Sequence, residues 1–255
     1  MTGPRVLVVP DAEAASVAAA DRISAILGAA AEARGAAHFA TTGGSTPVGI
    51  YRRLASSPLR DAMPWPDLHI WWGDDRFVRR GDPLSNVTAF DTVIVGEGSL
   101  ELEADRIHPF PVDEALNAGT GPDQCAARLA DELRTAYLEG ADGWPVLDLI
   151  LLGVGDDGHL LSVFPGSSAF EAAEWALGIP APTHIEPLVP RVTLNPAIVT
   201  VARQVLVVVS GSGKADVIAE ILTGSRDVRR LPAQLAARPG ATWILDQAAA
   251  SKLPG

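Results

Sequence analysis

A histidine and two carboxylates in one glycine-rich segment could form an acid–base pair. Gly153-Val154-Gly155-Asp156-Asp157-Gly158-His159 follows the strongest apolar run of the sequence. An imidazole suits proton transfer near neutral pH, because its ordinary pKa is about 6.5. We therefore predict that His159 acts as a general base. Asp157, or Asp74 from another segment, could orient its ring.

Other segments carry groups that could hold a phosphate. Thr41-Thr42-Gly43-Gly44-Ser45-Thr46-Pro47 leads into a helix pattern, and free N–H groups at a helix start favour an anion. Ser210-Gly211-Ser212-Gly213-Lys214-Ala215 is a second glycine-rich helix start, with a lysine. The phosphate-binding residues that we predict from these segments and from two arginines are Gly43, Gly44, Ser45, Thr46, Arg76, Arg191 and Lys214.

The glycine-rich segments at residues 153–158 and 210–215 do not fit a nucleotide site well. Residues 153–158 match the G-x-G-x-x-G pattern, but Asp156 and Asp157 would put negative charge where a pyrophosphate should lie. Pro165 also comes too soon for a long helix after this loop. The Ser210 segment lacks the first glycine and the final hydroxyl of a nucleotide-hydrolase loop. A dehydrogenase and a nucleotide hydrolase are therefore disfavoured.

The elements that must position these loops alternate between apolar runs and helix-period segments. Several apolar runs are continuous, which is typical of strands covered on both faces. The alternation predicts an α/β fold with a mostly parallel sheet, whose carboxyl edge gathers the loops. We expect strands at residues 5–9, 37–41, 68–72, 147–154, 204–210 and 242–245, and helices at residues 12–34, 123–139 and 214–222.

Composition narrows the possible partners. The chain has 255 residues and a formal net charge of −11, which opposes non-specific binding to nucleic acid or to an anionic membrane. The single cysteine, Cys125, excludes an internal disulfide and a cysteine-based zinc site. We expect Cys125 to pack inside a helix and the site to use no metal.

No linker divides the chain. We expect a single domain over residues 1–255, with the Pro-rich residues 178–190 as a surface loop and a frayed tail after Asp246. No segment reaches the roughly 18 apolar residues of a membrane span. The apolar run of residues 6–9 is too short for a signal-peptide core. These features predict a cytoplasmic location and no membrane partner.

The motifs closely resemble those of the 6-phosphogluconolactonase family, in the glucosamine/galactosamine-6-phosphate isomerase superfamily. The matching segments follow one another along nearly the whole chain: residues 42–47, 73–78, 85–86, 153–159, 162–166, 190–194 and 211–215. The resemblance implies a Rossmann-like sheet with helices on both faces, like that of the deaminases and isomerases, and no cofactor. It implies a small sugar phosphate as partner, and we expect a monomer or small homo-oligomer.

The implied reaction is hydrolysis of 6-phospho-D-glucono-1,5-lactone to 6-phospho-D-gluconate, in the oxidative pentose phosphate pathway. Placed on this chain, His159 would activate a water that attacks the lactone carbonyl. Two positions depart from the family pattern. Asp75 stands where a glutamate is common, and Leu160-Leu161-Ser162 stands where Thr-Ala-Ser is frequent.

Two alternatives stay open. One is a glucosamine-6-phosphate deaminase and isomerase, which would use a carboxylate as base at C2. The other is a non-catalytic phosphosugar-binding module. Phe164-Pro165-Gly166 and the Asp-Asp-Arg loop favour the lactonase over the deaminase. The charge of −11, and the lack of residues for a DNA-binding helix-turn-helix, oppose a regulator.

Overall fold

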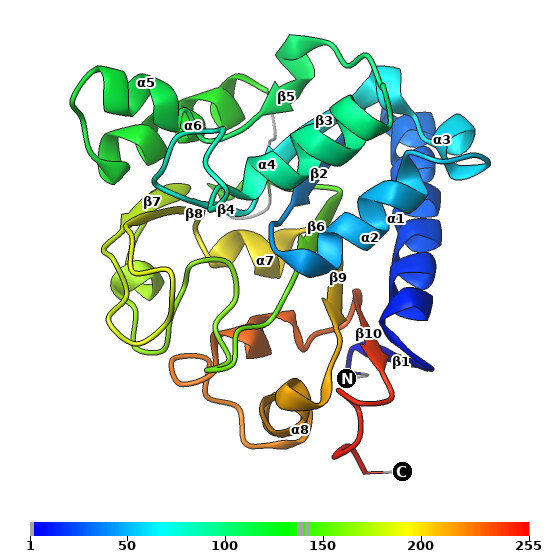
Figure 1. Cartoon of the computed structure of the whole chain (residues 1–255). Helices are drawn as coiled ribbons and strands as arrows, with labels where there is room; N and C mark the ends of the chain where they lie inside the picture. Colours follow the sequence, from blue (N-terminus) through cyan, green and yellow to red (C-terminus); the bar gives the residue numbers. More distant parts are fainter. Residues whose placement is uncertain (1–2, 137–139, 141–142, 255) are drawn as a thin grey trace.

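The computed structural model describes residues 3–136, 140 and 143–254, and a parallel sheet forms its central layer (Figure 1). All six strands expected from the sequence belong to this sheet, so the α/β class is confirmed. Across the described residues the sheet has seven strands, in the order β1 (Arg5–Val9), β10 (Ala241–Asp246), β9 (Gln204–Val209), β6 (Leu149–Leu152), β2 (Ala37–Thr41), β3 (Leu68–Trp72) and β5 (Ile107–His108).

The strands that precede the predicted site loops are neighbours in this sheet. β9, β6, β2 and β3 lie side by side, and all of their pairings are parallel. They end at Val209, Leu152, Thr41 and Trp72. The segments that follow these residues therefore leave the sheet at the same edge, as expected for a ligand site in an open α/β sheet.

A smaller antiparallel sheet, which we did not predict, begins two residues after β3. Within the described part of the chain it contains β4 (Asp74–Arg76), β8 (Arg191–Leu194) and β7 (Ala176–Ile179), with β8 in the middle. The register of β4 and β8 sets Arg76 directly opposite Arg191. Two cations from distant parts of the sequence thus become neighbours.

The first helix, α1 (Ala12–Arg34), has the predicted bounds. The Asp11 side chain caps it by accepting a hydrogen bond from the Ala14 N–H at 2.8 Å, and Gly35 ends it with a φ of 75°. The α-helices that follow are α2 (Ser45–Leu54), α3 (Leu59–Ala62), α4 (Asn86–Phe90), α5 (Val112–Asn117), α6 (Pro122–Thr135), α7 (Ala197–Val201) and α8 (Ala215–Thr223).

Among the described helices, α1 is the one long and apolar enough to cross a membrane by length and composition. The relevant window has a mean hydropathy of 1.3, but 44% of it is buried inside the protein. Ile23 and Leu27 are fully buried, and the helix contacts β10, β2 and β9 (Figure 1). These contacts are those of a core helix.

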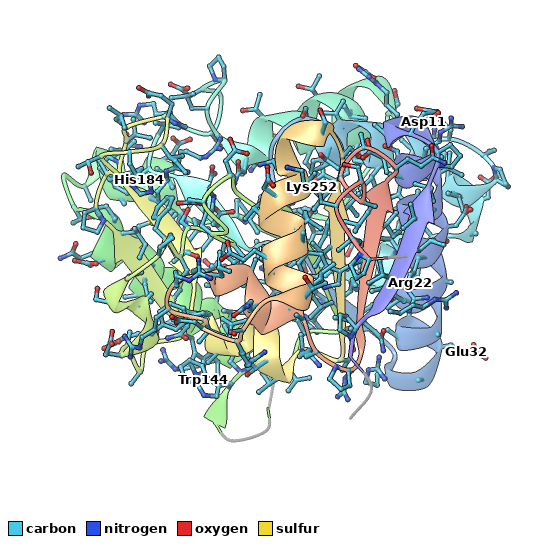
Figure 2. All side chains as sticks on the ribbon, turned by 90° about the horizontal axis from the view of Figure 1, so that it is seen from below. Asp11, Arg22, Glu32, Trp144, His184 and Lys252 are labelled. Carbon is cyan, nitrogen blue, oxygen red and sulfur yellow. The ribbon has the colours of Figure 1, made fainter. Side chains whose placement is uncertain are left out.

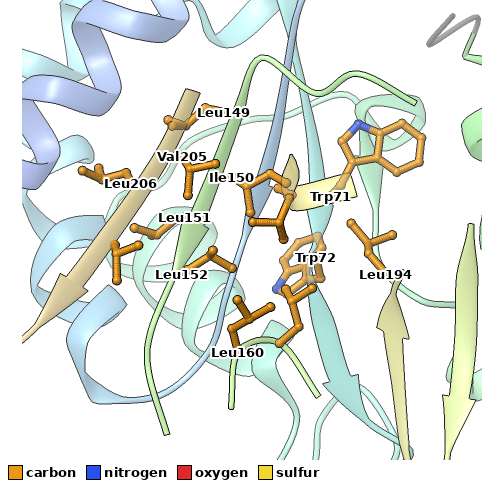
Figure 3. Close-up of a cluster of buried hydrophobic side chains, with 14 of the residues drawn as sticks. Trp71, Trp72, Leu149, Ile150, Leu151, Leu152, Leu160, Leu194, Val205 and Leu206 are labelled. Carbon is orange, nitrogen blue, oxygen red and sulfur yellow. The ribbon is translucent and has the colours of Figure 1, made fainter. Parts of the chain in front are cut away.

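The central strands are anchored by large apolar side chains (Figure 3). All four residues of β6 are buried, and Trp71 and Trp72 of β3 have no exposed surface. Burying one such side chain stabilises the fold by roughly 1.5–3 kcal/mol. The loops at the carboxyl edge therefore start from rigidly packed strands. Cys125 is buried in α6, as predicted.

Two strands are shorter than predicted. β6 covers Leu149–Leu152 of the expected 147–154, because the Asp148 carboxylate at its start accepts a backbone N–H and pairs with two arginines. β9 ends at Val209, so Ser210 already belongs to the loop that follows.

The helix predictions are close to the structure. α6 begins at Pro122 rather than at residue 123, and residues 137–139 of the predicted helix lie outside the described residues. α8 begins at Ala215, because the preceding residues form a short 3-10 turn, η6 (Ser212–Lys214).

Two predictions about irregular segments are wrong in part. Gly178 and Ile179 belong to β7, so the Pro-rich segment expected at 178–190 leaves the sheet only at residue 180. The tail after Asp246 does not fray, because the Ala249 N–H donates to the Asp246 carboxylate at 2.7 Å and Ala249 is fully buried.

Three histidines form a stacked row on adjacent strands. The rings of His38 and His69 lie 4.7 Å apart, and those of His69 and His108 lie 5.3 Å apart, between centroids. The Trp71 indole N–H donates to His38 Nδ1 at 3.2 Å, which requires that nitrogen to be unprotonated. Burial, followed by the charges of His69 and His108, lowers the pKa of His38 to about 4.

We predict that His38 makes the protein less stable in mild acid. The unfolded chain binds a proton at this residue below about pH 6.5, whereas the folded chain does so only near pH 4. The free energy of unfolding should fall through this window by on the order of 2 kcal/mol from this group. His38→Gln, which keeps an acceptor for Trp71, should remove that part. Chemical denaturation of both proteins at about pH 7.5 and about pH 4.5 measures it.

The comparison with the variant matters because buried Asp75 changes the free energy of unfolding with pH in the opposite direction. Burial raises the pKa of Asp75 to about 7, so its contribution to stability falls as the pH rises toward 7. Subtracting the variant from the wild type cancels this effect. If the stability difference between the two proteins were the same at both pH values, the assignment to His38 would be wrong.

Candidate active site

A cavity of about 340 Å³ lies where β9, β6, β2 and β3 end. This volume is in the range of small-molecule sites. A more open hollow of about 750 Å³ beside α1 and β1 contains none of the predicted site residues. The predicted residues that line the smaller cavity are Gly43, Gly44, Ser45, Thr46, Asp74, Arg76, His159, Arg191 and Lys214.

Asp157 does not line the cavity but supports His159. One carboxylate oxygen, Oδ1, lies 3.0 Å from the His159 backbone N and 2.6 Å from its ring Nδ1. Burial alone would raise the pKa of Asp157, but hydrogen bonds from His159 and His184 outweigh burial and lower it well below the usual range. The ionised carboxylate can only accept, so His159 Nδ1 carries a proton, and in the neutral imidazole Nε2 is then the atom with the lone pair.

The loop that carries this pair is built around glycines. The Gly155 N–H donates to the His159 carbonyl at 3.0 Å, which closes the loop on itself. A Cβ at Gly155 would lie 2.0 Å from His159 Nδ1, so no side chain fits there. Gly158 has a φ of 81°, a conformation that other residues rarely adopt. Gly155 therefore makes room for the imidazole, and Gly158 allows the turn that precedes it.

The second candidate carboxylate, Asp74, has different partners. Its Oδ2 accepts from the Ser162 hydroxyl at 2.6 Å, and its Oδ1 accepts from the Asn86 amide at 3.2 Å. Asp74 is 6% exposed and lines the cavity. Of the two carboxylates, the one hydrogen-bonded to His159 is therefore Asp157, while Asp74 remains as a separate acidic group in the same cavity.

Arg76 and Arg191 bring two guanidinium groups to this cavity from β4 and β8. Arg76 donates to the Leu84 carbonyl at 2.7 Å, and Arg191 donates to the Pro187 carbonyl at 3.0 Å. Arg191 is 3% exposed. Burial, followed by the charge of Arg76, lowers the pKa of Arg191. An anion bound between them would relieve this repulsion.

Unpaired polar atoms are concentrated in the same place. Among residues 3–136, 140 and 143–254, the buried side-chain atoms without a hydrogen-bond partner are Arg76 Nε, Asn86 Oδ1, Arg191 Nε and Ser210 Oγ. All four residues line the cavity. Buried polar groups are nearly always paired, so this concentration indicates a site that a polar ligand completes.

Asn86 and Ser210 were not among the predicted site residues. Asn86 is the first residue of α4, after the capping Ser85, and Ser210 is the first residue after β9. Their positions at a helix start and a strand exit are the signals that could have identified them.

The loop after β2 presents the start of α2 to the cavity. Gly44 precedes the helix with a φ of 94°, and the described residues provide no side-chain cap there. A Cβ at Gly43 would lie 1.9 Å from Asn86 Oδ1, so glycine permits the close approach of Asn86. The Tyr51 hydroxyl fixes the loop by donating to the Thr42 carbonyl at 3.0 Å. The uncapped N–H groups suit an anion.

Lys214 reaches the cavity from the 3-10 turn before α8. Its ammonium group donates to the Val154 carbonyl at 2.8 Å and pairs with the Asp156 carboxylate. The preceding turn is held by Asp246, whose two oxygens each lie 3.0 Å from the Gly211 N. A bound phosphate could therefore share this ammonium with Asp156.

Of the residues that depart from the family pattern, Leu161 lines the cavity, whereas Asp75 and Leu160 do not. Asp75, the middle residue of β4, is 2% exposed and accepts from the N–H groups of Arg76 and Asn86 at 2.7 and 2.6 Å. Leu160 is a core residue with 1% exposure. In the described residues, no group of three or more His, Cys, Asp or Glu side chains is arranged to hold a metal ion.

A parallel α/β sheet with an imidazole–carboxylate pair and a group of cations at its carboxyl edge could bind and transform a sugar phosphate. The chain belongs to the family described as glucosamine-6-phosphate isomerases/6-phosphogluconolactonase, which matches residues 10–245. This confirms the resemblance found in the sequence.

Individual relatives point to the lactonase branch. The 6-phosphogluconolactonase of Streptomyces coelicolor is 35% identical over 256 residues, which cover 98% of this chain and 95% of the relative. That of Synechocystis is 33% identical and covers 86% of each chain. The solved structure of 6-phosphogluconolactonase from Trypanosoma brucei superposes with a TM-score of 0.84 at 27% identity, over 98% of this chain and 99% of that one.

Substitution of Gly155 tests the geometry of the imidazole. In Gly155→Ala the new methyl group would overlap His159 Nδ1, so the ring must leave its present position beside Asp157. Because a displacement of about 1 Å can cost about 100-fold in rate, we expect kcat to fall by roughly that factor. Steady-state hydrolysis of the lactone, corrected for the uncatalysed rate, measures this.

Gly28→Ala is the matched control, because a Cβ at that helix position meets nothing within 4 Å. It should keep wild-type activity. Full activity of Gly155→Ala would show that the position of the His159 ring does not matter for the reaction.

Proposed function

We propose that this chain hydrolyses 6-phospho-D-glucono-1,5-lactone to 6-phospho-D-gluconate, a step of the oxidative pentose phosphate pathway. The observation that carries the proposal is that one cavity joins His159, held by Asp157, to the cations Arg76, Arg191 and Lys214. The substrate has the matching groups at its two ends, an electrophilic ester carbonyl and a phosphate. The curated relatives named 6-phosphogluconolactonase support the same activity.

His159 is the general base of the proposed reaction. Its Nε2 takes a proton from water while the water oxygen attacks C1 of the lactone. The C1–O5 bond then breaks, and the imidazolium returns the proton to the ring oxygen. Asp157 stabilises the imidazolium between these steps through the 2.6 Å contact with Nδ1. A positioned base contributes about 10²–10⁴-fold, which suits a reactive ester such as a δ-lactone.

The phosphate is held at the other end of the cavity. Arg76 and Arg191 each offer an Nε that has no partner within the described residues, and α2 offers uncapped N–H groups beside Ser45 and Thr46. Lys214 adds a third positive charge. Charge-assisted bonds of this kind are stronger than neutral ones, and they fix the sugar relative to His159.

The proposed domain organisation, location, oligomeric state and partners are those expected from the sequence. We propose that the single domain over residues 1–255 acts in the cytoplasm as a monomer or small homo-oligomer. Its partner is the sugar phosphate, with no role in binding nucleic acid or membrane. The net charge of −11 supports the last point, because it repels polyanions.

A glucosamine-6-phosphate deaminase is the second candidate, and Asp74 is the observation that favours it. Such an enzyme needs a carboxylate that can take a proton from C2 of the sugar. Asp74 lines the cavity and is 6% exposed. Its hydrogen bonds from Ser162 and Asn86 hold it in place, so it is the residue that would perform that step.

Product analysis distinguishes the two functions. The wild-type protein should form 6-phosphogluconate from the lactone faster than the uncatalysed reaction, and should release no ammonia from glucosamine 6-phosphate. His159→Ala should lose roughly 10²–10⁴-fold in kcat while still binding 6-phosphogluconate. Ammonia release at a rate comparable to lactone hydrolysis would favour the deaminase. Unchanged activity of His159→Ala would exclude it as the base.

Substitution of the cations should act mainly on KM. Arg76→Ala and Lys214→Ala remove contacts to the phosphate, which is distant from the bonds that change, so they weaken substrate and transition state alike. We expect KM to rise by about tenfold or more with a small change in kcat. Arg52→Ala, on the exposed face of α2, is the control. A fall in kcat with an unchanged KM would contradict a phosphate-holding role.

A further inference from the structure

We propose that His184 is a positioning residue for the His159–Asp157 pair, and that it ties the Pro-rich loop of residues 180–190 to the active site. The inference rests on the proposed lactone hydrolysis. It concerns the one histidine outside the stacked row and the catalytic pair, and no motif singled it out. Figure 2 shows His184 on the side of the molecule away from Arg22 of α1.

The first argument is that the two histidines share one carboxylate. Asp157 Oδ1 is engaged by His159, while Asp157 Oδ2 lies 2.9 Å from His184 Nε2. Because the carboxylate is ionised and can only accept, His184 Nε2 must be the donor. Both oxygens of Asp157 are therefore fixed.

Fixing the second oxygen matters because the last torsion of an aspartate is broad. With one oxygen free, the carboxylate can rotate about its Cβ–Cγ bond over a wide range. A donor on Oδ2 restricts this rotation and keeps Oδ1 in line with His159 Nδ1. The ring of His159 then presents Nε2 in one orientation, which is what a positioned base requires.

The second argument is that the same loop also contacts the anion site. The Pro187 carbonyl accepts from Arg191 at 3.0 Å, and the Pro190 carbonyl accepts from the Phe77 N–H at 2.8 Å. His184 and Pro187 therefore attach one short segment to both ends of the cavity, the imidazole end and the guanidinium end.

Phe164 packs between these groups. Its ring centroid lies 4.8 Å from that of His159 and 5.7 Å from that of His184, and the Arg191 guanidinium lies 5.7 Å from it. Phe164 is 7% exposed. His184 and His159 thus pack against the same aromatic ring, Phe164. This packing gives the hydrogen bond from His184 to Asp157 a defined geometry.

His184 acts through Asp157 rather than on the substrate. It does not line the cavity, and 51% of its side chain is exposed. Its removal should therefore change how well the base is placed and leave phosphate binding unchanged. This separates it from Arg76 and Lys214, whose loss should raise KM.

The test compares three variants of the full chain by steady-state hydrolysis of the lactone. His184→Ala should lower kcat by about tenfold with KM within about twofold of the wild type, because only the placement of the base is affected. His184→Gln places an amide N–H near the position of Nε2 and should recover most of the lost kcat. Thr183→Ala, at the adjacent exposed position, should match the wild type.

A second background separates positioning from a general weakening of the loop. In Asp157→Asn the acceptor of His184 is altered, so adding His184→Ala should cause little further loss of kcat. Equal kcat values for His184→Ala and Thr183→Ala would overturn the proposal. So would a tenfold loss that His184→Gln does not recover, or one that persists undiminished in the Asp157→Asn background.

These outcomes are distinct from failure of the proposed function. If the wild-type protein did not accelerate lactone hydrolysis, the function would be wrong. If the wild type is active and His184→Ala is equally active, only the role of His184 is wrong.

Discussion

Two arginines, Arg76 and Arg191, lie opposite each other on β4 and β8, and Arg191 is buried. Like charges in directly opposed positions of an antiparallel pair destabilise it. Asp74 and Asp75 on β4 oppose this repulsion, and their charges favour the charged form of Arg191. Each guanidinium nevertheless keeps an Nε without a partner in the described residues. The repulsion between the two arginines and their unpaired Nε atoms are both explained if a dianion binds between them.

The same constraint explains why three cations are gathered in one cavity of an acidic chain. With a net charge of −11, the whole molecule repels a sugar phosphate at long range. Attraction must therefore act at short range, in a cavity where water does not weaken it. Arg76, Arg191 and Lys214 meet that requirement because they come from separate elements that converge at one edge.

The elements that could be predicted from the sequence are those with a uniform pattern of burial or with clear signals at both ends. β6 is apolar throughout because both of its faces are covered, and α1 has a capping aspartate and a terminal glycine at the predicted bounds. The loops after β2 and β6 were predicted as site loops, since strand exits in a parallel sheet share an edge. All of these signals are local.

What sequence could not supply are pairings between distant residues. Asp157 is close to His159 in sequence, but that Asp74 instead accepts from Ser162, 88 positions away, could not be seen from local patterns. The antiparallel sheet of β4, β8 and β7 joins segments of opposite direction that no local pattern links. The contact of His184 with Asp157 depends on the path of a loop of irregular backbone. Each needs the folded chain to bring its partners together.

The glycine motif of residues 153–158 shows how a sequence pattern and its physical role can differ. The same letters in a dinucleotide site allow a pyrophosphate to approach the backbone. Here Gly155 is required because the His159 ring occupies the space of its side chain, and Asp156 pairs with Lys214. The imidazole of His159, from the same loop, thus occupies the space that a side chain at residue 155 would need. The motif thus places the His159 ring beside Asp157, while the cations Arg76 and Arg191 reach the cavity from the neighbouring sheet.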